Sequence, residues 1–265
     1  MILFRNLDIG DVPPTPLTLF ENFNTDKASS LLLEHAKRFG YPVGYLQEQH
    51  GQIVQNLFPI KKEAEKQISS SSKVNLELHT ETAFHTYLPD YLLLLCLRGD
   101  SNAGTTYSLL SDILKDIHIG IVEILKKNLF KTSIDDSFRL NGEDDYFTTV
   151  PVISKDINNR YIMKYDKTVM TGTTTEAQMA LNVFTKAIER NTQTVFLKAG
   201  DLLVLDNNIT VHGRTPFQAR YDGTDRWVQR VVVRKEINSI KNKTTCPSTG
   251  YTVITKYKED DNEQR

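Results

Sequence analysis

The sequence predicts a mainly β protein with flanking helices, in which strands from both ends of the chain close one barrel-like sandwich. Strand-like apolar runs occur before residue 110 and again after residue 194, helical periodicity fills much of the interval, and no linker composition separates the two β regions. With 265 residues, of which 39% are hydrophobic and 25% charged, the chain suffices for one domain with one core.

Three helices are predicted. Residues 26–39 begin at the capping residue Asp26 and end before Gly40, and residues 111–125 repeat apolar side chains at three- and four-residue steps. Another helix begins near Thr173, which forms a capping-box pattern with Glu176. The acidic turn at 142–145, between the last two helices, is predicted to be a mobile loop.

Strands are predicted where apolar residues run continuously or alternate with polar ones, at 51–59, 73–78, 91–97, 104–110, 194–199, 202–206 and 227–233. We expect 91–97 and 104–110 to be neighbours in one sheet. The four serines at 69–72 are predicted to form a flexible loop just before the strand at 73–78.

Charge and hydropathy exclude several classes of partner. The formal net charge of -1 leaves no basic excess for phosphates, so no nucleic-acid partner is expected. The longest apolar run, 91–97, is too short to span a bilayer, and the first residues show no signal-peptide pattern, so we expect a cytoplasmic protein without a membrane partner. The two cysteines suggest neither a disulfide framework nor a zinc site, and the oligomeric state is not predicted.

A candidate metal motif, His79-Thr80-Glu81, follows the strand at 73–78. Residues two apart at a strand end point to the same side, so His79 and Glu81 can reach one metal ion. A ferrous site that activates dioxygen needs two imidazoles and one carboxylate on one face. With six histidines and 33 acidic residues, about 0.7 such short motifs are expected by chance, so the motif needs support elsewhere.

That support comes from the last third of the chain. His212 ends an apolar strand, and Arg226 begins the next one. The guanidinium of Arg226 could hold the distal carboxylate of 2-oxoglutarate in a bidentate pair while the keto-acid end chelates the metal. The alternative is a surface ion pair with Asp222 or Asp225.

Four stretches of sequence carry a family resemblance: HTETAFHTYLPDY (79–91), LCLR (95–98), AGTTY (103–107) and VLDNNITVHGRTPFQARYDGTDRWVQRVVV (204–233). They resemble the clavaminate synthase-like oxygenases, and within these the hydroxylases of free amino acids. The resemblance covers residues from about 52 to 234. It implies a double-stranded β-helix core (jelly-roll, cupin-like) and dependence on Fe(II), 2-oxoglutarate and O2. We expect one oxygenase domain over 1–235 and a polar C-terminal extension over 236–265.

By this resemblance, His79, Glu81 and His212 are the iron ligands and carry the catalysis, with Glu81 also beside the substrate. Arg226 pairs with the distal carboxylate of 2-oxoglutarate. The resemblance also implies hydroxylation rather than halogenation, because related halogenases lack the carboxylate ligand that Glu81 supplies. His85 resembles a family position outside the metal shell and is expected to be structural.

The resemblance extends to the co-substrate and substrate. Thr106, rather than Thr105, places a hydroxyl on the same distal carboxylate. Arg230 holds a substrate α-carboxylate, unless it forms a structural salt bridge. Gln55 contacts the substrate amino group, unless it is a surface residue. Asp166 binds a cationic side chain, unless it is a turn aspartate.

The function implied is hydroxylation of a C–H bond in a free, basic or polar amino acid, with release of succinate and CO2. One alternative is desaturation or cyclisation of an amino-acid-derived intermediate by the same kind of enzyme. A zinc hydrolase could use the same three ligands, but it would not need Arg226. A non-catalytic, cupin-like metal-binding module is the remaining alternative. The single tryptophan, Trp227, is expected to pack the core rather than to stack on a substrate.

Overall fold

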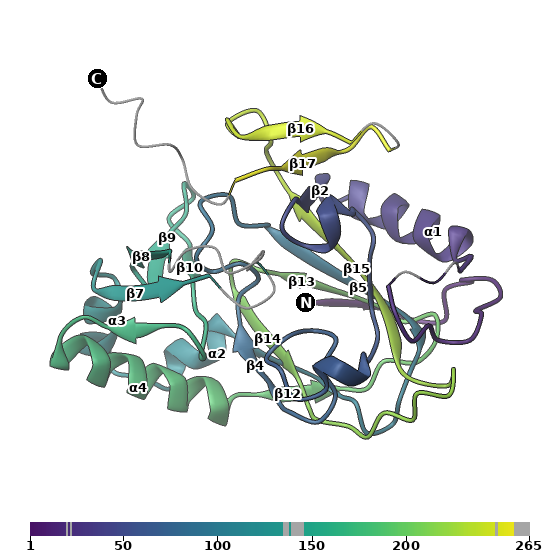
Figure 1. Ribbon diagram of the computed structural model, residues 1–265. Helices are drawn as coiled ribbons and strands as arrows, with labels where there is room; N and C mark the ends of the chain where they lie inside the picture. The colour runs from purple at the N-terminus through teal and green to yellow at the C-terminus, as the bar shows by residue number, and fades with distance from the viewer. Residues whose placement is uncertain (20, 22, 135–137, 139–145, 247–248, 257–265) are drawn as a thin grey trace.

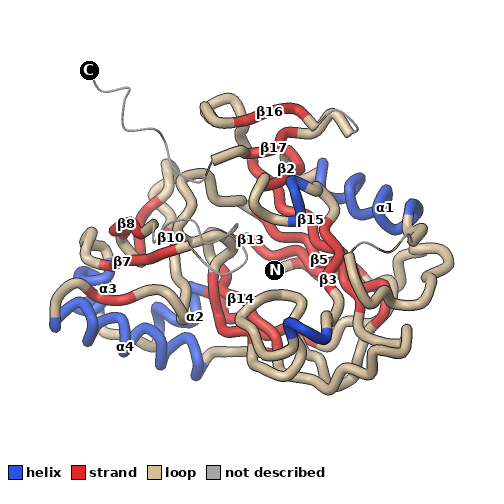
Figure 2. Tube along the Cα trace, in the orientation of Figure 1, coloured by secondary structure: helices blue, strands red, loops and turns tan. Residues whose placement is uncertain are grey.

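A computed structural model describes residues 1–19, 21, 23–134, 138, 146–246 and 249–256. The protein is mainly β, as predicted, with two larger sheets, two small ones and peripheral helices (Figures 1 and 2). Within these residues, no helix has both the length and the apolar character that crossing a membrane requires.

The largest sheet has eight strands, and its centre is the antiparallel set β13-β5-β15. The strand nearest the C-terminus, β17, joins it by pairing in parallel with β2. In spatial order the strands are β1 (Ile2–Phe4), β13 (Leu202–Asp206), β5 (Tyr91–Arg98), β15 (Trp227–Arg234), β2 (Tyr41–Tyr45), β17 (Thr252–Ile254) and β16 (Lys243–Thr245), with β3 (Gln55–Leu57) also paired to β15.

The second sheet has four strands in the order β12 (Gln193–Val195), β6 (Thr105–Leu109), β14 (Thr210–Arg214) and β4 (Leu76–His79). Early and late strands therefore pair in both sheets, as predicted. The expectation that 91–97 and 104–110 are neighbours was wrong, because β5 and β6 belong to different sheets. The short connection at 99–104 carries the chain from one sheet to the other, and nearness in sequence does not fix pairing.

Two small sheets lie between β6 and β12 along the chain, where the sequence had predicted helices and a turn but no strand. One has the order β11-β7-β8 and the other pairs β10 with β9. Their strands are β7 (Phe130–Ser133), β8 (Phe147–Val150), β9 (Ile153–Lys155), β10 (Tyr161–Met163) and β11 (Thr171–Gly172). The turn predicted at 142–145 lies outside the described residues.

The helices are α1 (Asp26–Lys37), α2 (Leu110–Lys115), α3 (Ile119–Leu125) and α4 (Thr175–Arg190), with 3-10 turns η1 (Gln49–Gly51) and η2 (Lys61–Glu63). The helix predicted at 111–125 is in fact two, because His118 has an extended backbone and its ring accepts the Gly120 N–H to cap α3. Thr174, not Thr173, caps α4 by accepting the Ala177 N–H at 3.1 Å.

The core follows the alternation of β5. Leu92, Leu94 and Cys96 join the apolar cluster that contains Tyr45 and Phe138. Leu93, Leu95 and Leu97 pack on the side covered by α1. Trp227 is fully buried on the α1 side, as predicted. A third cluster packs α2, α3 and α4 against the four-stranded sheet.

The serine run at 69–72 is a loop, as predicted, but its second half is buried and hydrogen-bonded rather than exposed. Ser71 and Ser72 are each only 1% exposed. The backbone of Ser72 bonds to Ala64 and to Phe217, at 3.1 and 2.8 Å. Sequence composition alone could not show that segments distant in the chain would satisfy these serines.

Candidate active site

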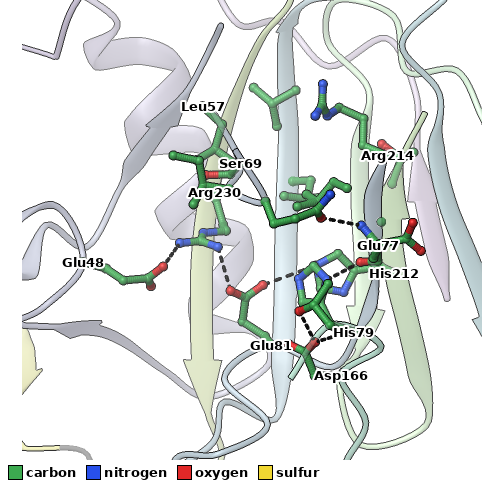
Figure 3. Close-up of a pocket in the computed structure, with 18 of the residues that line it drawn as sticks. Glu48, Leu57, Ser69, Glu77, His79, Glu81, Asp166, His212, Arg214 and Arg230 are labelled. Carbon is green, nitrogen blue, oxygen red and sulfur yellow. Dashed lines mark hydrogen bonds and ion pairs between the residues drawn. The ribbon is translucent and has the colours of Figure 1, made fainter. Parts of the chain in front are cut away.

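A cavity of about 90 Å³ lies between the two larger sheets (Figure 3). Strands β5 and β15 supply one wall, and β4, β6 and β14 supply the other. Most of the polar residues that the sequence singled out line this cavity: His79, Glu81, Asp166, His212, Arg226 and Arg230.

The two histidines face each other across neighbouring strands. His79 and His212 are register partners in the β4–β14 pair, and their ring centroids are 4.4 Å apart. Glu81 follows just beyond the end of β4. One potential ligand atom from each residue lies within 4.8 Å of the other two, so these three side chains could hold one metal ion.

The hydrogen bond of His79 fixes its tautomer. Nδ1 lies 2.7 Å from the carbonyl oxygen of Glu77, which can only accept, so Nδ1–H donates and Nε2 keeps a free lone pair. Burial, followed by repulsion from His79 whenever that ring is protonated, lowers the pKa of His212. Both effects favour the neutral imidazoles that metal ligation requires.

Glu81 is held as a carboxylate with one oxygen unsatisfied. Its Oε2 lies 3.3 Å from Nε2 of His212, but no well-directed hydrogen bond reaches this buried oxygen from the described residues. Burial raises the pKa of Glu81, but Arg230 and the two histidines outweigh it and hold the pKa below its usual value. An orphaned carboxylate oxygen beside two imidazoles fits a bound cation.

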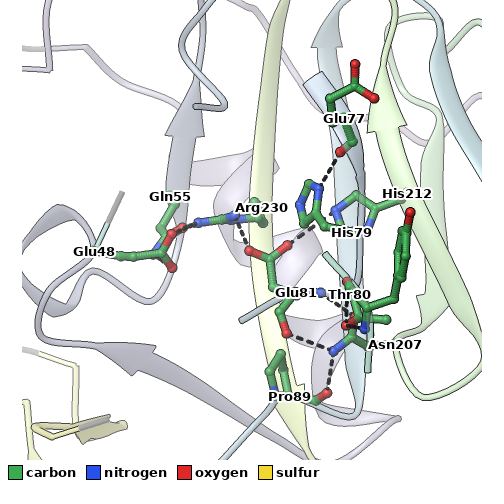
Figure 4. A network of polar contacts seen from close by, with 11 residues as sticks. Glu48, Gln55, Glu77, His79, Thr80, Glu81, Pro89, Asn207, His212 and Arg230 are labelled. Atoms are coloured by element: carbon green, nitrogen blue, oxygen red, sulfur yellow. Dashed lines mark hydrogen bonds and ion pairs between the residues drawn. The ribbon is translucent and has the colours of Figure 1, made fainter. Parts of the chain in front are cut away.

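Asn207 fixes the backbone at Glu81. This side chain is 2% exposed; its Oδ1 accepts the Glu81 N–H at 2.7 Å, and its Nδ2 donates to the carbonyl oxygens of Glu81 and Pro89 at 3.2 and 2.9 Å (Figure 4). The sequence interpretation had given Asn207 no role. Asn207 immediately follows β13, so it ties the candidate metal site to the large sheet.

Arg230 is the centre of a buried charge network (Figure 4). Its guanidinium donates to Glu81 Oε1 at 2.6 Å, to Glu48 Oε1 at 2.7 Å and, through Nε, to Gln55 Oε1 at 2.8 Å. Gln55 is 3% exposed, so the surface alternative for it was wrong. Glu48 was missed, because it lies in a turn whose sequence shows no pattern.

The opposite end of the cavity is basic. Arg226 is 8% exposed, and its Nη2 lies 3.5 Å from the Thr105 hydroxyl. Burial lowers the pKa of Arg226. Among the described residues Arg226 has no ion pair, so the surface pairing with Asp222 or Asp225 was wrong. Asp225 instead accepts the backbone N–H groups of Arg220 and Tyr221.

The choice between the two threonines is reversed by the structure. Thr105 pairs with Arg214 and Thr106 with Gly213 in the β6–β14 register, so their side chains point to opposite faces. Thr105 lines the cavity beside Arg226. The Thr106 hydroxyl instead lies against Gly213, 3.0 Å from the position that a Cβ atom on this glycine would occupy. Thr106 therefore cannot share a ligand with Arg226.

The backbone of Asp166 pairs with that of His79 in an isolated antiparallel β-bridge. Its Oδ1 accepts from the Thr168 N–H and hydroxyl and from the Val169 N–H, at 2.7, 2.6 and 3.2 Å. Asp166 is thus a turn aspartate, one of the two alternatives. It also lines the cavity, and among the described residues no hydrogen bond reaches its second oxygen.

His85 lies outside the metal cluster. It is fully buried, its Nδ1 accepts the Tyr87 N–H at 2.8 Å, and its ring packs against Tyr45 and Phe138. Burial, followed by Arg234 and Lys164, lowers the pKa of His85 to about 3. It is a neutral packing residue.

Comparisons with known proteins identify the family of the chain. The model of the taurine catabolism dioxygenase TauD, TfdA family matches residues 15–232. An L-asparagine oxygenase of Streptomyces coelicolor is 33% identical over an alignment of 258 positions, which covers 94% of this chain and 75% of that protein.

Two solved structures superpose closely. Asparagine oxygenase with Fe(II), 3-hydroxyasparagine and succinate has a TM-score of 0.85 at 32% identity, covering 96% of this chain and 79% of the other. The non-heme iron oxygenase OrfP with Fe, succinate and (3S)-hydroxy-L-Arg has a TM-score of 0.84 at 28% identity, covering 94% and 80%. The resemblance found in the sequence, and the iron- and 2-oxoglutarate-dependent enzyme class it implied, are thereby confirmed: the chain belongs to the taurine catabolism dioxygenase TauD, TfdA family.

Proposed function

We propose that this protein hydroxylates a C–H bond of a free amino acid, using Fe(II) held by His79, Glu81 and His212 and 2-oxoglutarate held by Arg226. The observation that carries the proposal is the polarity of one cavity. A triad that fits a metal lies at its centre, Arg226 lies at one end without a carboxylate, and Arg230 lies at the other end in a charge network.

The fold supports this proposal. Antiparallel strands from the first and last parts of the chain interleave in two sheets that line one cavity. This is the arrangement expected of a double-stranded β-helix, or jelly-roll, and we propose that core for the protein. We likewise propose one oxygenase domain over 1–235, which contains the family match. Of the extension expected over 236–265, β16 and β17 join the largest sheet and Ile254 packs in its core, so this part completes the domain.

The triad fits ferrous iron by its chemistry. Two neutral imidazoles and one carboxylate on a single face leave positions open for a chelating keto acid and dioxygen. Iron bound there would couple the oxidative decarboxylation of 2-oxoglutarate, to succinate and CO2, to oxidation of the substrate by dioxygen. The protein's share is to orient both organic molecules, exclude water and hold Glu81 ionised through Arg230.

The co-substrate would lie toward Arg226 and Thr105. A buried guanidinium without a carboxylate is costly unless an anion binds it, and the distal carboxylate of 2-oxoglutarate is such an anion. A zinc hydrolase would bind no 2-oxoglutarate, so Arg226 would have no anionic ligand. This residue therefore favours the oxygenase over the hydrolase and over a non-catalytic module.

The network around Arg230 fits the charged groups of a free amino acid. Its guanidinium can take the α-carboxylate, while the Glu48 carboxylate that it now pairs with can take the α-ammonium. Gln55 supports both groups through its contacts with Arg230 and, at 3.5 Å, with Glu48. Glu48 thus acts as a place-holder for the substrate carboxylate until a substrate binds.

The side-chain end of the substrate would face Asp166. Because Oδ1 already accepts three hydrogen bonds, only Oδ2 remains, and a bidentate pair with a guanidinium is disfavoured. We propose a polar side chain with one donor group directed at Asp166, such as a carboxamide or an ammonium. The similarity to an asparagine oxygenase supports the carboxamide.

The test begins with binding. Under anaerobic conditions, adding Fe(II) and 2-oxoglutarate should produce the visible charge-transfer band of the chelate. We expect Arg226→Met to weaken 2-oxoglutarate binding about 100-fold and to leave the KM for the amino acid nearly unchanged. Arg230→Met should do the reverse. Absence of the band in the wild-type protein would overturn the proposal.

Screening free amino acids then identifies the reaction. Asparagine, glutamine, lysine and arginine should be compared for coupled succinate release. A product heavier by one oxygen indicates hydroxylation, whereas the loss of two hydrogens indicates desaturation or cyclisation. Asp166→Ala should reduce coupling for the preferred substrate. A cytoplasmic location, and the lack of a nucleic-acid partner, remain predictions from the sequence.

A further inference from the structure

Two buried arginines, rather than one, occupy the basic end of the cavity. Arg214 lies on β14, two residues beyond His212, and is 3% exposed. It is the register partner of Thr105, and the hydroxyl of Thr105 accepts the long contact from Nη2 of Arg226. Thr105 therefore lies next to both arginines, and all three residues line the same cavity.

Neither guanidinium has a carboxylate partner among the described residues. At the other end of the cavity, by contrast, Arg230 pairs with both Glu48 and Glu81. Burying two like charges close together is unfavourable unless a bound anion compensates them. If Arg226 alone contacted the distal carboxylate, the buried guanidinium of Arg214 would have no anion beside it.

The contacts of Arg214 leave part of its guanidinium unused. Nη2 donates to the Ser71 hydroxyl at 2.8 Å and has a long contact with the Val74 carbonyl oxygen at 3.5 Å. The guanidinium also lies 5.0 Å from the centre of the Phe217 ring. Nε and Nη1 are buried and have no hydrogen-bond partner among the residues described. Anchoring the serine run uses only one nitrogen and does not require a charge.

We propose, resting on the proposed function, that Arg214 is the second cation of the subsite that binds the distal carboxylate of 2-oxoglutarate. A carboxylate offers two oxygens with about four lone pairs, so it can interact with Arg226 and Arg214 together. Arg214 thereby makes the cavity selective for a keto acid with a second negative charge. It is a co-substrate-binding residue, not only a support for the loop.

The experiment measures binding without turnover. Protein loaded with Ni(II) is titrated calorimetrically with 2-oxoglutarate and with 2-oxopentanoate, which has a methyl group in place of the distal carboxylate. We expect Arg214→Gln to weaken 2-oxoglutarate binding about 10- to 100-fold and to leave 2-oxopentanoate binding nearly unchanged. Arg214→Lys, which keeps the charge, should retain most of the preference for 2-oxoglutarate.

Two control variants separate charge from loop support. Ser71→Ala removes the anchor and keeps the charge, so the preference for 2-oxoglutarate should persist. Arg98→Gln removes a part-buried arginine outside the cavity, whose terminal nitrogens bond to Thr15, Val12 and Pro13, and should lower stability without changing either affinity.

Three outcomes would overturn the inference. Arg214→Gln could weaken both keto acids equally, it could leave 2-oxoglutarate binding intact, or Ser71→Ala could reproduce its effect. If Arg214→Gln fails to fold, complete loss of the preference in Arg214→Lys would contradict a role for charge. A wild-type protein that binds Ni(II) but neither keto acid would instead contradict the proposed function itself.

Discussion

Asn207 offers the sharpest test of how the fold holds the triad. Asn207→Asp keeps the shape of the side chain and the acceptor for the Glu81 N–H, but it replaces the Nδ2 donor with an oxygen. That oxygen would face the carbonyl oxygens of Glu81 and Pro89, which now accept at 3.2 and 2.9 Å. A buried carbonyl left without a donor costs about 1–3 kcal/mol, so we expect a total loss of about 2–6 kcal/mol in stability.

The assay has two parts. Denaturant unfolding of the metal-free protein measures the loss of stability. Calorimetric titration measures the affinity of the triad for Ni(II), which should fall about 10- to 100-fold because Glu81 is no longer fixed. Asn158→Asp, at an exposed turn, is the matched control and should change neither quantity. An Asn207→Asp protein within about 0.5 kcal/mol of wild type, with unchanged Ni(II) affinity, would refute the reasoning.

Three further predictions concern the site and its surroundings. Thr105→Val should weaken 2-oxoglutarate binding about fivefold, whereas Thr106→Val should not, and calorimetry on the Ni(II) protein would show either result. Because the pKa of His85 is lowered to about 3, the unfolded chain binds a proton at this residue below about pH 6.5 and the folded protein does not. The free energy of unfolding should therefore fall by about 1.4 kcal/mol per pH unit between pH 6.5 and 3, and His85→Phe should flatten that part of the stability profile. Metal at 100 times its Kd should stabilise the protein by about 2.7 kcal/mol in thermal unfolding, and His79→Ala should abolish this gain.

Strand periodicity explains what the sequence could predict. Apolar runs defined β4, β5, β13 and β15, and His79 is the last residue of β4. The strand that carries His212 was not predicted separately, because β13 and β14 were interpreted as one apolar run although they belong to different sheets. The short strands β7 to β11 were missed because each has at most four residues. The break between α2 and α3 was missed because both helices keep the same apolar spacing, and the capping contact of His118 does not alter that pattern.

The site residues that the sequence misjudged depend on contacts between distant segments. Choosing between Thr105 and Thr106 requires the register of β6 on β14, since a one-residue shift moves a side chain to the other face. Glu48 meets Arg230 across 182 positions of sequence, from a turn without any periodic signal. For Asp166, sequence offered two roles as alternatives, and its two oxygens allow both.

The backbone pairing beside His79 bears on how such an enzyme can diversify. Thr80 N–H donates to the Tyr165 carbonyl oxygen at 2.7 Å and Lys167 N–H to that of Leu78 at 3.2 Å, on either side of the His79–Asp166 bridge. An insertion or deletion in this segment would displace His79, the proposed metal ligand, whereas a substitution at Asp166 would leave these main-chain bonds intact. If Asp166 faces the substrate as proposed, a substitution there could change substrate preference without disturbing the backbone at His79, whereas a change of loop length could not.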